Sequence, residues 1–326
     1  MPHIKKVVTI GGGTGTFTVL SGLKKYPLDL TAIVTMSDDG GSSGMLRDEY
    51  GVLPPGDVRQ SLVALSDAAP VMRNLFNHRY QGGGLKGHNF GNLFISTLEQ
   101  VTGSLDKALE VVSKVLNIRG QVVPVTFDKV KLLVELKNGK IIHGEDALRS
   151  YQLVSRFGIK RIHLQPKAEP NPKALQAIKE ADIIIVGPGH LYGSLIPNFL
   201  VKGISQAFAK SKAKKIYIAN LMNRHGHTDG FSVGDYVETL ERVIGKKHVF
   251  DAVVFNTKKP SPKLIKRYAD EGEPVSNEHG KNGYKLIGAN LLSEGKVKVK
   301  KGDPLAWQRA LIRHDPEKLA KAILRA

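Results

Sequence analysis

Residues 6–18 read KVVTIGGGTGTFT, and this stretch decides the class of fold. The apolar run 6–10 predicts a short buried strand, and the apolar spacing that continues to about Lys25 predicts a helix directly after it. A glycine-rich turn between a strand and a helix lets a ligand approach the backbone at the helix N-terminus. A tight turn without a ligand would have the same composition. We expect the ligand at four residues of this turn: Gly12, Gly13, Thr14 and Gly15.

The turn matches neither of two common phosphate-binding fingerprints. Counted from Gly11, the third glycine of a dinucleotide-binding motif is replaced by Thr16, and no Gly-Lys-Ser/Thr of a Walker loop follows. The motif therefore predicts a site next to the backbone without naming its ligand.

Further apolar segments alternate with amphipathic helical ones, which is typical of an α/β fold with a mostly parallel sheet and helices on both faces. The expected strands are 6–10, 30–36, 122–125, 183–186, 215–219 and 252–255, and the expected helices are 105–116, 174–180, 199–208 and 316–324. Residues 130–143 read VKLLVELKNGKIIH, which predicts a β-hairpin turning at Asn138 and Gly139 and added to the sheet. We expect one domain over residues 1–326 with a C-terminal helical extension.

Composition narrows the class of protein. The 326 residues include no cysteine, which excludes disulfides and thiolate metal sites and weakly favours the cytoplasm. No apolar run approaches the roughly 20 residues that span a bilayer. The formal charge of +18 suggests nucleic-acid binding, but the basic residues are scattered and aromatic residues make up only 6%. A solvated basic surface is the better interpretation, so nucleic acid is an unlikely partner.

The second expected strand runs into SDDGGSSGMLR, residues 37–47. Carboxylates there can hold Mg²⁺ against a phosphate, act as a base towards a hydroxyl, or bond a ribose, while hydroxyls and an arginine contact phosphate oxygens. A solvated acidic turn is the competing interpretation. The candidate residues are Asp38 and Asp39 as catalytic groups, with Asp38 also as a metal ligand, and Ser42, Ser43 and Arg47 as phosphate or sugar contacts.

Four later loops add polar groups. LPPGDVRQSL (53–62) suggests Asp57 as a helix N-cap and Arg59 as a phosphate or sugar contact. GHNFGNL (87–93) places Asn89 and Asn92 at a helix start, where they contact a phosphate or sugar or only cap the helix. GPGHLYGSLIPN (187–198) repeats the strand–glycine–helix logic, so we expect exposed backbone amides there. IANLMNRHGHTDG (218–230) follows another strand, and its His225 and His227 are weak evidence for a metal site. The ligand-binding candidates in the last two loops are Gly187, Pro188, Gly189, His190 and Asn220.

Together, GGGTG, SDDGGSSGMLR, PPGDVRQSLVALS, GHNFGNL, GPGHLYGSLIPN and NLMNRHGHTDG resemble, in order and spacing, the YvcK/CofD family, and the likeness covers residues 4–256. The family groups bacterial gluconeogenesis factors with 2-phospho-L-lactate transferases, and the chain looks closer to the first branch. The resemblance implies a Rossmann-like sheet, nucleotide contacts at residues 12–15 and 187–190, and a metal or acceptor near Asp38 or Asp39. Departures at His190, at residues 223–227 and at Asn89 affect the loops that would set sugar or base specificity.

Two functions fit these motifs. One is a regulator that binds a UDP-sugar such as UDP-N-acetylglucosamine, without an established reaction, and affects cell shape and growth on gluconeogenic carbon, as the resemblance implies. The other is a magnesium-dependent transferase acting on a nucleoside-diphosphate-linked donor. Magnesium is the only cofactor suggested, and regulatory protein partners and a homo-oligomer are compatible with the sequence.

Overall fold

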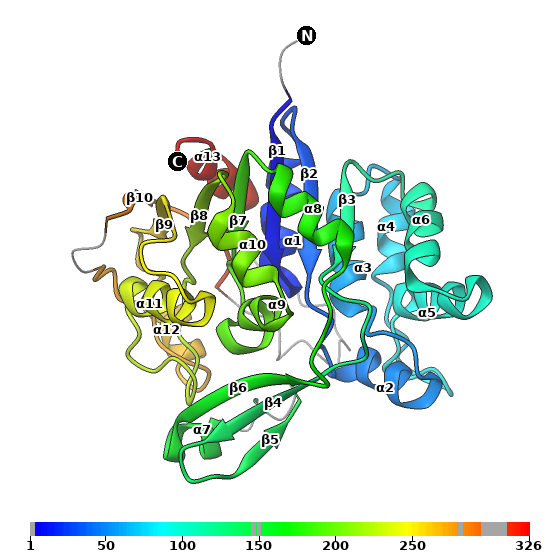
Figure 1. Cartoon of the computed structure of the whole chain (residues 1–326), viewed down its shortest axis with the longest axis horizontal. Helices are drawn as coiled ribbons and strands as arrows, with labels where there is room; N and C mark the ends of the chain where they lie inside the picture. The colour runs from blue at the N-terminus through cyan, green and yellow to red at the C-terminus, as the bar shows by residue number, and fades with distance from the viewer. Residues whose placement is uncertain (1–3, 145–147, 149–150, 280–282, 295–311) are drawn as a thin grey trace.

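The computed structural model describes residues 4–144, 148, 151–279, 283–294 and 312–326. Its centre is a seven-stranded sheet in the order β10-β9-β8-β7-β1-β2-β3, in which every pairing is parallel (Figure 1). The strands are β1 (Lys6–Gly11), β2 (Asp29–Val34), β3 (Gln121–Pro124), β7 (Ile183–Val186), β8 (Lys214–Ile218), β9 (Ala252–Asn256) and β10 (Lys285–Ala289). The strand order reverses between β1 and β7, which is the Rossmann-like arrangement expected from the sequence.

Both faces of this sheet carry apolar side chains, and helices cover each face. One face packs against α1 (Gly13–Leu23), α3 (Gly56–Leu65), α5 (Phe90–Thr102), α6 (Leu105–Val115) and α13 (Pro316–Leu324). The other packs against α8 (Pro172–Glu180), α9 (Ile196–Leu200), α10 (Ile204–Lys210) and α11 (Val233–Ile244). Successive side chains of β1 point to opposite faces: Val7 packs on the side of α1 and α3, and Val8 on the side of α8–α11.

A second, antiparallel sheet lies beside the carboxyl ends of the parallel strands (Figure 1). It pairs β4 (Lys131–Leu136) with β5 (Ile141–His143) on one side and β6 (Ile159–Gln165) on the other. Its apolar face, including Leu132, Val134 and Leu164, is continuous with the core on the α8–α11 side of the large sheet. The remaining α-helices of the described residues are α2 (Gly41–Tyr50), α4 (Pro70–Phe76), α7 (Tyr151–Phe157) and α12 (Pro262–Tyr268).

The six expected strands and the hairpin are confirmed, with bounds that shift by one or two residues. The hairpin does not extend the large sheet, because its free edge pairs with β6, which the sequence did not predict. The expected helix 199–208 is wrong as a single element: it is split into α9 and α10 at Gly203, whose φ of +79° is not helical. Among the described residues, no helix is long and apolar enough to cross a bilayer.

Candidate functional site

Two glycine loops meet at the point where the strand order reverses. The loop after β1 leads into α1, and the loop after β7 leads into the π-helical turn η2 (Leu191–Leu195). They are in contact, since a Cβ on Gly15 would lie 1.9 Å from the carbonyl oxygen of Pro188. Ligands of open α/β sheets bind at this position, at the carboxyl ends of the strands. The structure thus brings together the two loops that the sequence singled out.

Asp57 faces the first of these loops. It is buried in the first turn of α3, accepts a hydrogen bond from the backbone of Gly13, and its Oδ2 lies 2.1 Å from where a Cβ on Gly12 would be. Burial first, and then the charge of Asp38, raise the pKa of Asp57 to about 7. The expected role of Asp57 as the N-cap of its own helix is wrong, because Pro55 occupies that position. It stands instead at the N-terminus of α1.

The two adjacent acids of the 37–47 stretch point in different directions. Asp38 accepts a hydrogen bond from the backbone N–H of Gly40 at 3.0 Å, and its Oδ2 lies 2.5 Å from the Cβ position of Gly56, next to Asp57. Asp39 instead lies against Gly144, where a Cβ would be 1.6 Å from its Oδ2. The acid whose charge acts on Asp57 is therefore Asp38, and Asp39 contacts the residue after β5 in the small sheet.

The helices that begin beside these acids have no side-chain N-cap. Gly12 caps α1 and Gly40 caps α2, and neither offers a side-chain oxygen to the first amides. By contrast, Asn89 caps α5 and Ser104 caps α6, and the expected contact of Asn89 with a phosphate or sugar stays a prediction. A helix N-terminus carries partial positive charge, which favours anions, and here the Gly13 N–H of α1 already donates to Asp57 and the Gly40 N–H before α2 to Asp38. These two N-termini border the Asp38–Asp57 pair.

A buried polar network joins α2, α3 and α5 beneath the site. Arg59 donates from Nε to Asn92 Oδ1 at 2.8 Å and from Nη1 to Asn77 Oδ1 at 2.7 Å. Burial and the neighbouring Arg79 lower the pKa of Arg59 to about 10, a value at which it remains charged at neutral pH. The Asn92 amide also reaches Ser43 Oγ at 3.5 Å. Arg59 thus binds the start of α5 and the end of α4, Asn92 links α5 to α2, and the contact of Arg59 with a phosphate stays a prediction.

Ser42 and Arg47 occupy different parts of α2. Ser42 is buried and accepts a hydrogen bond from the backbone N–H of Asn89 at 3.2 Å, so it belongs to the same network. Arg47 lies in the last turn of α2 and donates from Nε and Nη2 to Asp48 Oδ1, each at 3.0 Å. The structure does not join Arg47 to the network of α2, α3 and α5.

The loop after β7 uses its amides within the protein. Gly187 donates its N–H to the Ile10 carbonyl at 3.3 Å, Pro188 has none, and Gly189 donates to Asn220 Oδ1 at 3.1 Å. Asn220 returns a hydrogen bond from Nδ2 to the Gly189 carbonyl at 2.9 Å. The expectation that Gly187 and Gly189 expose their amides is wrong, because the sheet and Asn220 accept them. Their contact with a nucleotide remains a prediction.

A pair of histidines connects this loop to the next strand end. His190 Nδ1 accepts from the Gly193 N–H, its Nε2 lies 2.7 Å from His227 Nδ1, and His227 Nε2 contacts the Leu148 carbonyl. Because a carbonyl only accepts, His227 carries its proton on Nε2, and His190 then donates to it from Nε2. Burial, with the charge of Arg224, lowers the pKa of His227 to about 4. Both rings are thus held as neutral Nε2–H tautomers.

The donor set fits Mg²⁺. Asp38 and Asp57 supply carboxylate oxygens, and α1 and α2 supply backbone amides for phosphate oxygens, which is the mixture by which proteins hold magnesium on a nucleotide. A cation there would also relieve the repulsion between the two acids. Sequence reasoning missed Asp57, although an acid after Pro-Pro-Gly beside a glycine loop was a usable signal. Thr14 is exposed and Gly13 half-buried, so the site is open to solvent.

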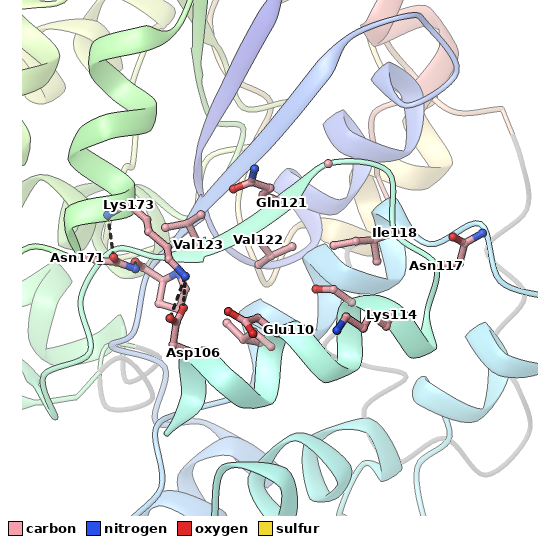
Figure 2. Close-up of a pocket in the computed structure, with 14 residues that line it drawn as sticks. Asp106, Glu110, Lys114, Asn117, Ile118, Gln121, Val122, Val123, Asn171 and Lys173 are labelled. Atoms are coloured by element: carbon pink, nitrogen blue, oxygen red, sulfur yellow. Dashed lines mark hydrogen bonds and ion pairs between the residues drawn. The ribbon is translucent and has the colours of Figure 1, made fainter. Parts of the chain in front are cut away.

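A cavity of about 560 Å³ lies elsewhere, between α6 and the edge strand β3 (Figure 2). Its lining includes Glu110, Lys114 and Gln121, and Lys173 spans its end with an ion pair to Asp106 at 2.8 Å. None of its lining residues belongs to the loops described above. We therefore place the functional site at the strand ends, where Asp38 and Asp57 meet the N-termini of α1 and α2, and not in this cavity.

A family described as 2-phospho-L-lactate transferase CofD matches residues 7–292. The chain belongs to the CofD/YvcK family. A relative from Nostoc sp. is 44% identical over 98% of this chain and 68% of its own length. A protein of Halalkalibacterium halodurans named gluconeogenesis factor is 40% identical over 98% of this chain and 96% of its own. A crystal structure of a Bacillus halodurans protein superposes with a TM-score of 0.89 at 38% identity, covering 99% of this chain and 100% of that one.

Membership of the CofD/YvcK family confirms the expected resemblance and the α/β fold. Many relatives carry the gluconeogenesis-factor name, so this chain lies with that group while sharing its fold with the transferases. The individual site residues are not tested by these similarities.

Proposed function

We propose that this CofD/YvcK family member is a cytoplasmic regulator that binds a nucleotide sugar, such as UDP-N-acetylglucosamine, and affects cell shape and carbon use. The observation that carries the proposal is the placement of two electrostatically interacting acids at two helix N-termini, Asp57 at that of α1 and Asp38 at that of α2. A diphosphate with one Mg²⁺ matches both charges of such a site, since amides bind phosphate oxygens and carboxylates bind the metal. Resemblance to gluconeogenesis factors supports the choice of a UDP-sugar.

The second candidate is a magnesium-dependent transferase acting on a nucleoside-diphosphate-linked donor. It is favoured by Asp57, whose pKa of about 7 suits a general base at neutral pH. In that role Asp57 takes the proton of an acceptor hydroxyl while the amides of α1 and α2 stabilise charge on the phosphate. Bound magnesium would polarise the phosphoryl oxygens.

Calorimetric titration with UDP-N-acetylglucosamine, UDP-glucose and GDP, with and without Mg²⁺, tests both candidates. We expect saturable, magnesium-dependent UDP-sugar binding that weakens roughly tenfold or more in Asp57→Asn, as expected for a lost metal or phosphate partner. Asp106→Asn, in a surface ion pair on α6, is the matched control and should bind normally. The incubated mixtures are then analysed for cleavage.

The outcomes separate the two candidates. Binding without product after long incubation excludes the transferase. Product formation that Asp38→Asn abolishes excludes a pure regulator. Equal affinity of Asp57→Asn and wild type would place the ligand elsewhere and refute the site itself.

A further inference from the structure

Three metal-ligating side chains converge outside the nucleotide site. His225 and Asp229 lie in the loop after β8, and Glu273 follows α12. His225 Nδ1 is 2.8 Å from Asp229 Oδ1 and 3.6 Å from Glu273 Oε2, and one ligand atom from each residue lies within 4.8 Å of the others. The side chains are 37%, 48% and 38% exposed, so an ion from solvent can reach them.

The histidine is held in one tautomer by a group outside the cluster. Its Nε2 lies 2.8 Å from the carbonyl oxygen of Ala269, which only accepts hydrogen bonds, so Nε2 carries the proton. Nδ1 faces two carboxylate oxygens, and without a metal ion a proton on Nδ1 makes the hydrogen bond to Asp229. That arrangement is stable only with a cation at Nδ1, either a proton or a metal ion. A histidine that donates its far N–H to a backbone carbonyl is the usual form of a metal-bound imidazole.

The carboxylates are oriented in the same way. The second oxygen of Asp229 accepts from the Gly226 N–H at 2.6 Å, and the second oxygen of Glu273 accepts from the Gly230 N–H at 2.8 Å. Each acid therefore uses its outer oxygen on the backbone and turns the inner one towards His225. Backbone atoms of three separate positions fix all three ligands, which is the outer support that metal sites require.

The two chain segments that carry the ligands are locked together. Asn223 donates its N–H to the Glu273 carbonyl at 2.7 Å, and His225 donates its N–H to the Glu271 carbonyl at 2.9 Å. Gly272 packs so closely that a Cβ would lie 1.9 Å from the Asn223 carbonyl oxygen. The ligands thus extend from a rigid two-stranded contact, and small side-chain rotations suffice to reach the separation of about 3.4 Å that tetrahedral bonds of ~2.1 Å require.

We infer that His225, Asp229 and Glu273 form a binding site for a divalent zinc-class ion, with solvent as the fourth ligand. One imidazole and two carboxylates suit Zn²⁺ or Co²⁺ better than Mg²⁺, which prefers oxygen ligands alone. The ion would clip the loop after β8 to the segment after α12. That loop carries His227 and follows Asn220, so the ion would stiffen one wall of the strand-end site.

The test uses the full-length, tag-free protein after chelator treatment. Isothermal titration with ZnCl₂ and absorption spectra with CoCl₂ should give one site per chain, with visible Co²⁺ bands of four- or five-coordinate geometry, and MgCl₂ should not compete. Asp229→Asn and Glu273→Gln keep the acceptors for Gly226 and Gly230, so they should fold while losing at least tenfold in Zn²⁺ affinity. His248→Asn removes an exposed histidine elsewhere and should bind as wild type does.

Each outcome of these titrations either supports or overturns the proposed metal site. Loss of the Co²⁺ bands in Asp229→Asn and Glu273→Gln, with unchanged far-ultraviolet circular dichroism, supports the site. Absence of stoichiometric Zn²⁺ and Co²⁺ binding by the wild type, or equal binding by both variants, overturns it. Because nucleotide affinity is not the readout, the result does not depend on the function proposed above.

Discussion

Replacing Asp57 by asparagine should stabilise the protein, and more so as the pH rises. The pKa of Asp57 is about 7 in the folded protein, against 3.8 for an ordinary aspartate. The folded state therefore binds more protons than the unfolded state between these values, so stability is present below pH 3.8 and is lost as the pH rises to 7. Three pH units at 1.36 kcal/mol each set a limit of about 4 kcal/mol.

The part of this loss of unfolding free energy that can be measured occurs between pH 5 and pH 8.5. There Asp57 alone should cost the wild type about 2–3 kcal/mol of unfolding free energy. Asp57→Asn removes that cost, because the amide is nearly the same shape and its oxygen still accepts from Gly13. Urea unfolding followed by circular dichroism at both pH values gives the difference, with Asp106→Asn expected to follow the wild type.

The predicted pH dependence is refuted if the difference in unfolding free energy between Asp57→Asn and wild type is equal at both pH values, or if it shrinks towards pH 8.5. The same substitution should weaken magnesium–nucleotide binding. Stability and binding would then move in opposite directions, as expected where an acid pair is kept for function at a cost in stability.

Three further substitutions test other contacts. Gly15→Ala should lower stability by about 2 kcal/mol or more in thermal unfolding, because its Cβ would clash with backbone, whereas Gly82→Ala, in open space, should not. Arg59→Met should cost about 1–3 kcal/mol in urea unfolding, because it leaves the buried amide oxygen of Asn92 without its donor. Arg242→Met, at a side chain that is 71% exposed, should cost under ~0.5 kcal/mol. Burial lowers the pKa of His314 to about 4, against 6.5 for an ordinary histidine. The stability that its neutral imidazole contributes is therefore present above pH 6.5 and is lost as the pH falls towards 4. In His314→Gln the fall in unfolding free energy between pH 6.5 and pH 4 should be smaller by roughly 3 kcal/mol, and an unchanged pH dependence would contradict this prediction.

The sequence predicted the parts of the fold that depend on local pattern. The buried strands are short apolar runs, and the glycine turns after β1 and β7 mark where ligand loops begin. The sequence did not predict β6 and β10, because edge strands that expose one face to solvent mix charged and apolar residues, as IKRIHLQ at 159–165 does. The broken helix at Gly203 was hidden by apolar spacing that continues across the break.

The site was predicted less completely because its pairs are far apart in the chain. Asp38 and Asp39 are neighbours in sequence, yet the partner of Asp38 is Asp57, brought close by the packing of α3 against α1. Likewise, His225 and His227 suggested little by spacing, because only His225 belongs to the metal-ligand cluster and its member Glu273 lies 44 residues beyond Asp229. Such pairings follow from tertiary contacts and leave no local signature.

The position of β1 also governs how the chain folds during synthesis. β1 is paired on one side with β2, which follows within 30 residues, and on the other with β7, which begins at residue 183. At ~5–20 residues per second, β7 leaves the ribosome roughly 10–35 s after β1. Throughout that interval the central strand has one unpaired edge. Nascent chains halted before residue 183 should therefore aggregate or bind chaperones more than those that extend past β10 and α13.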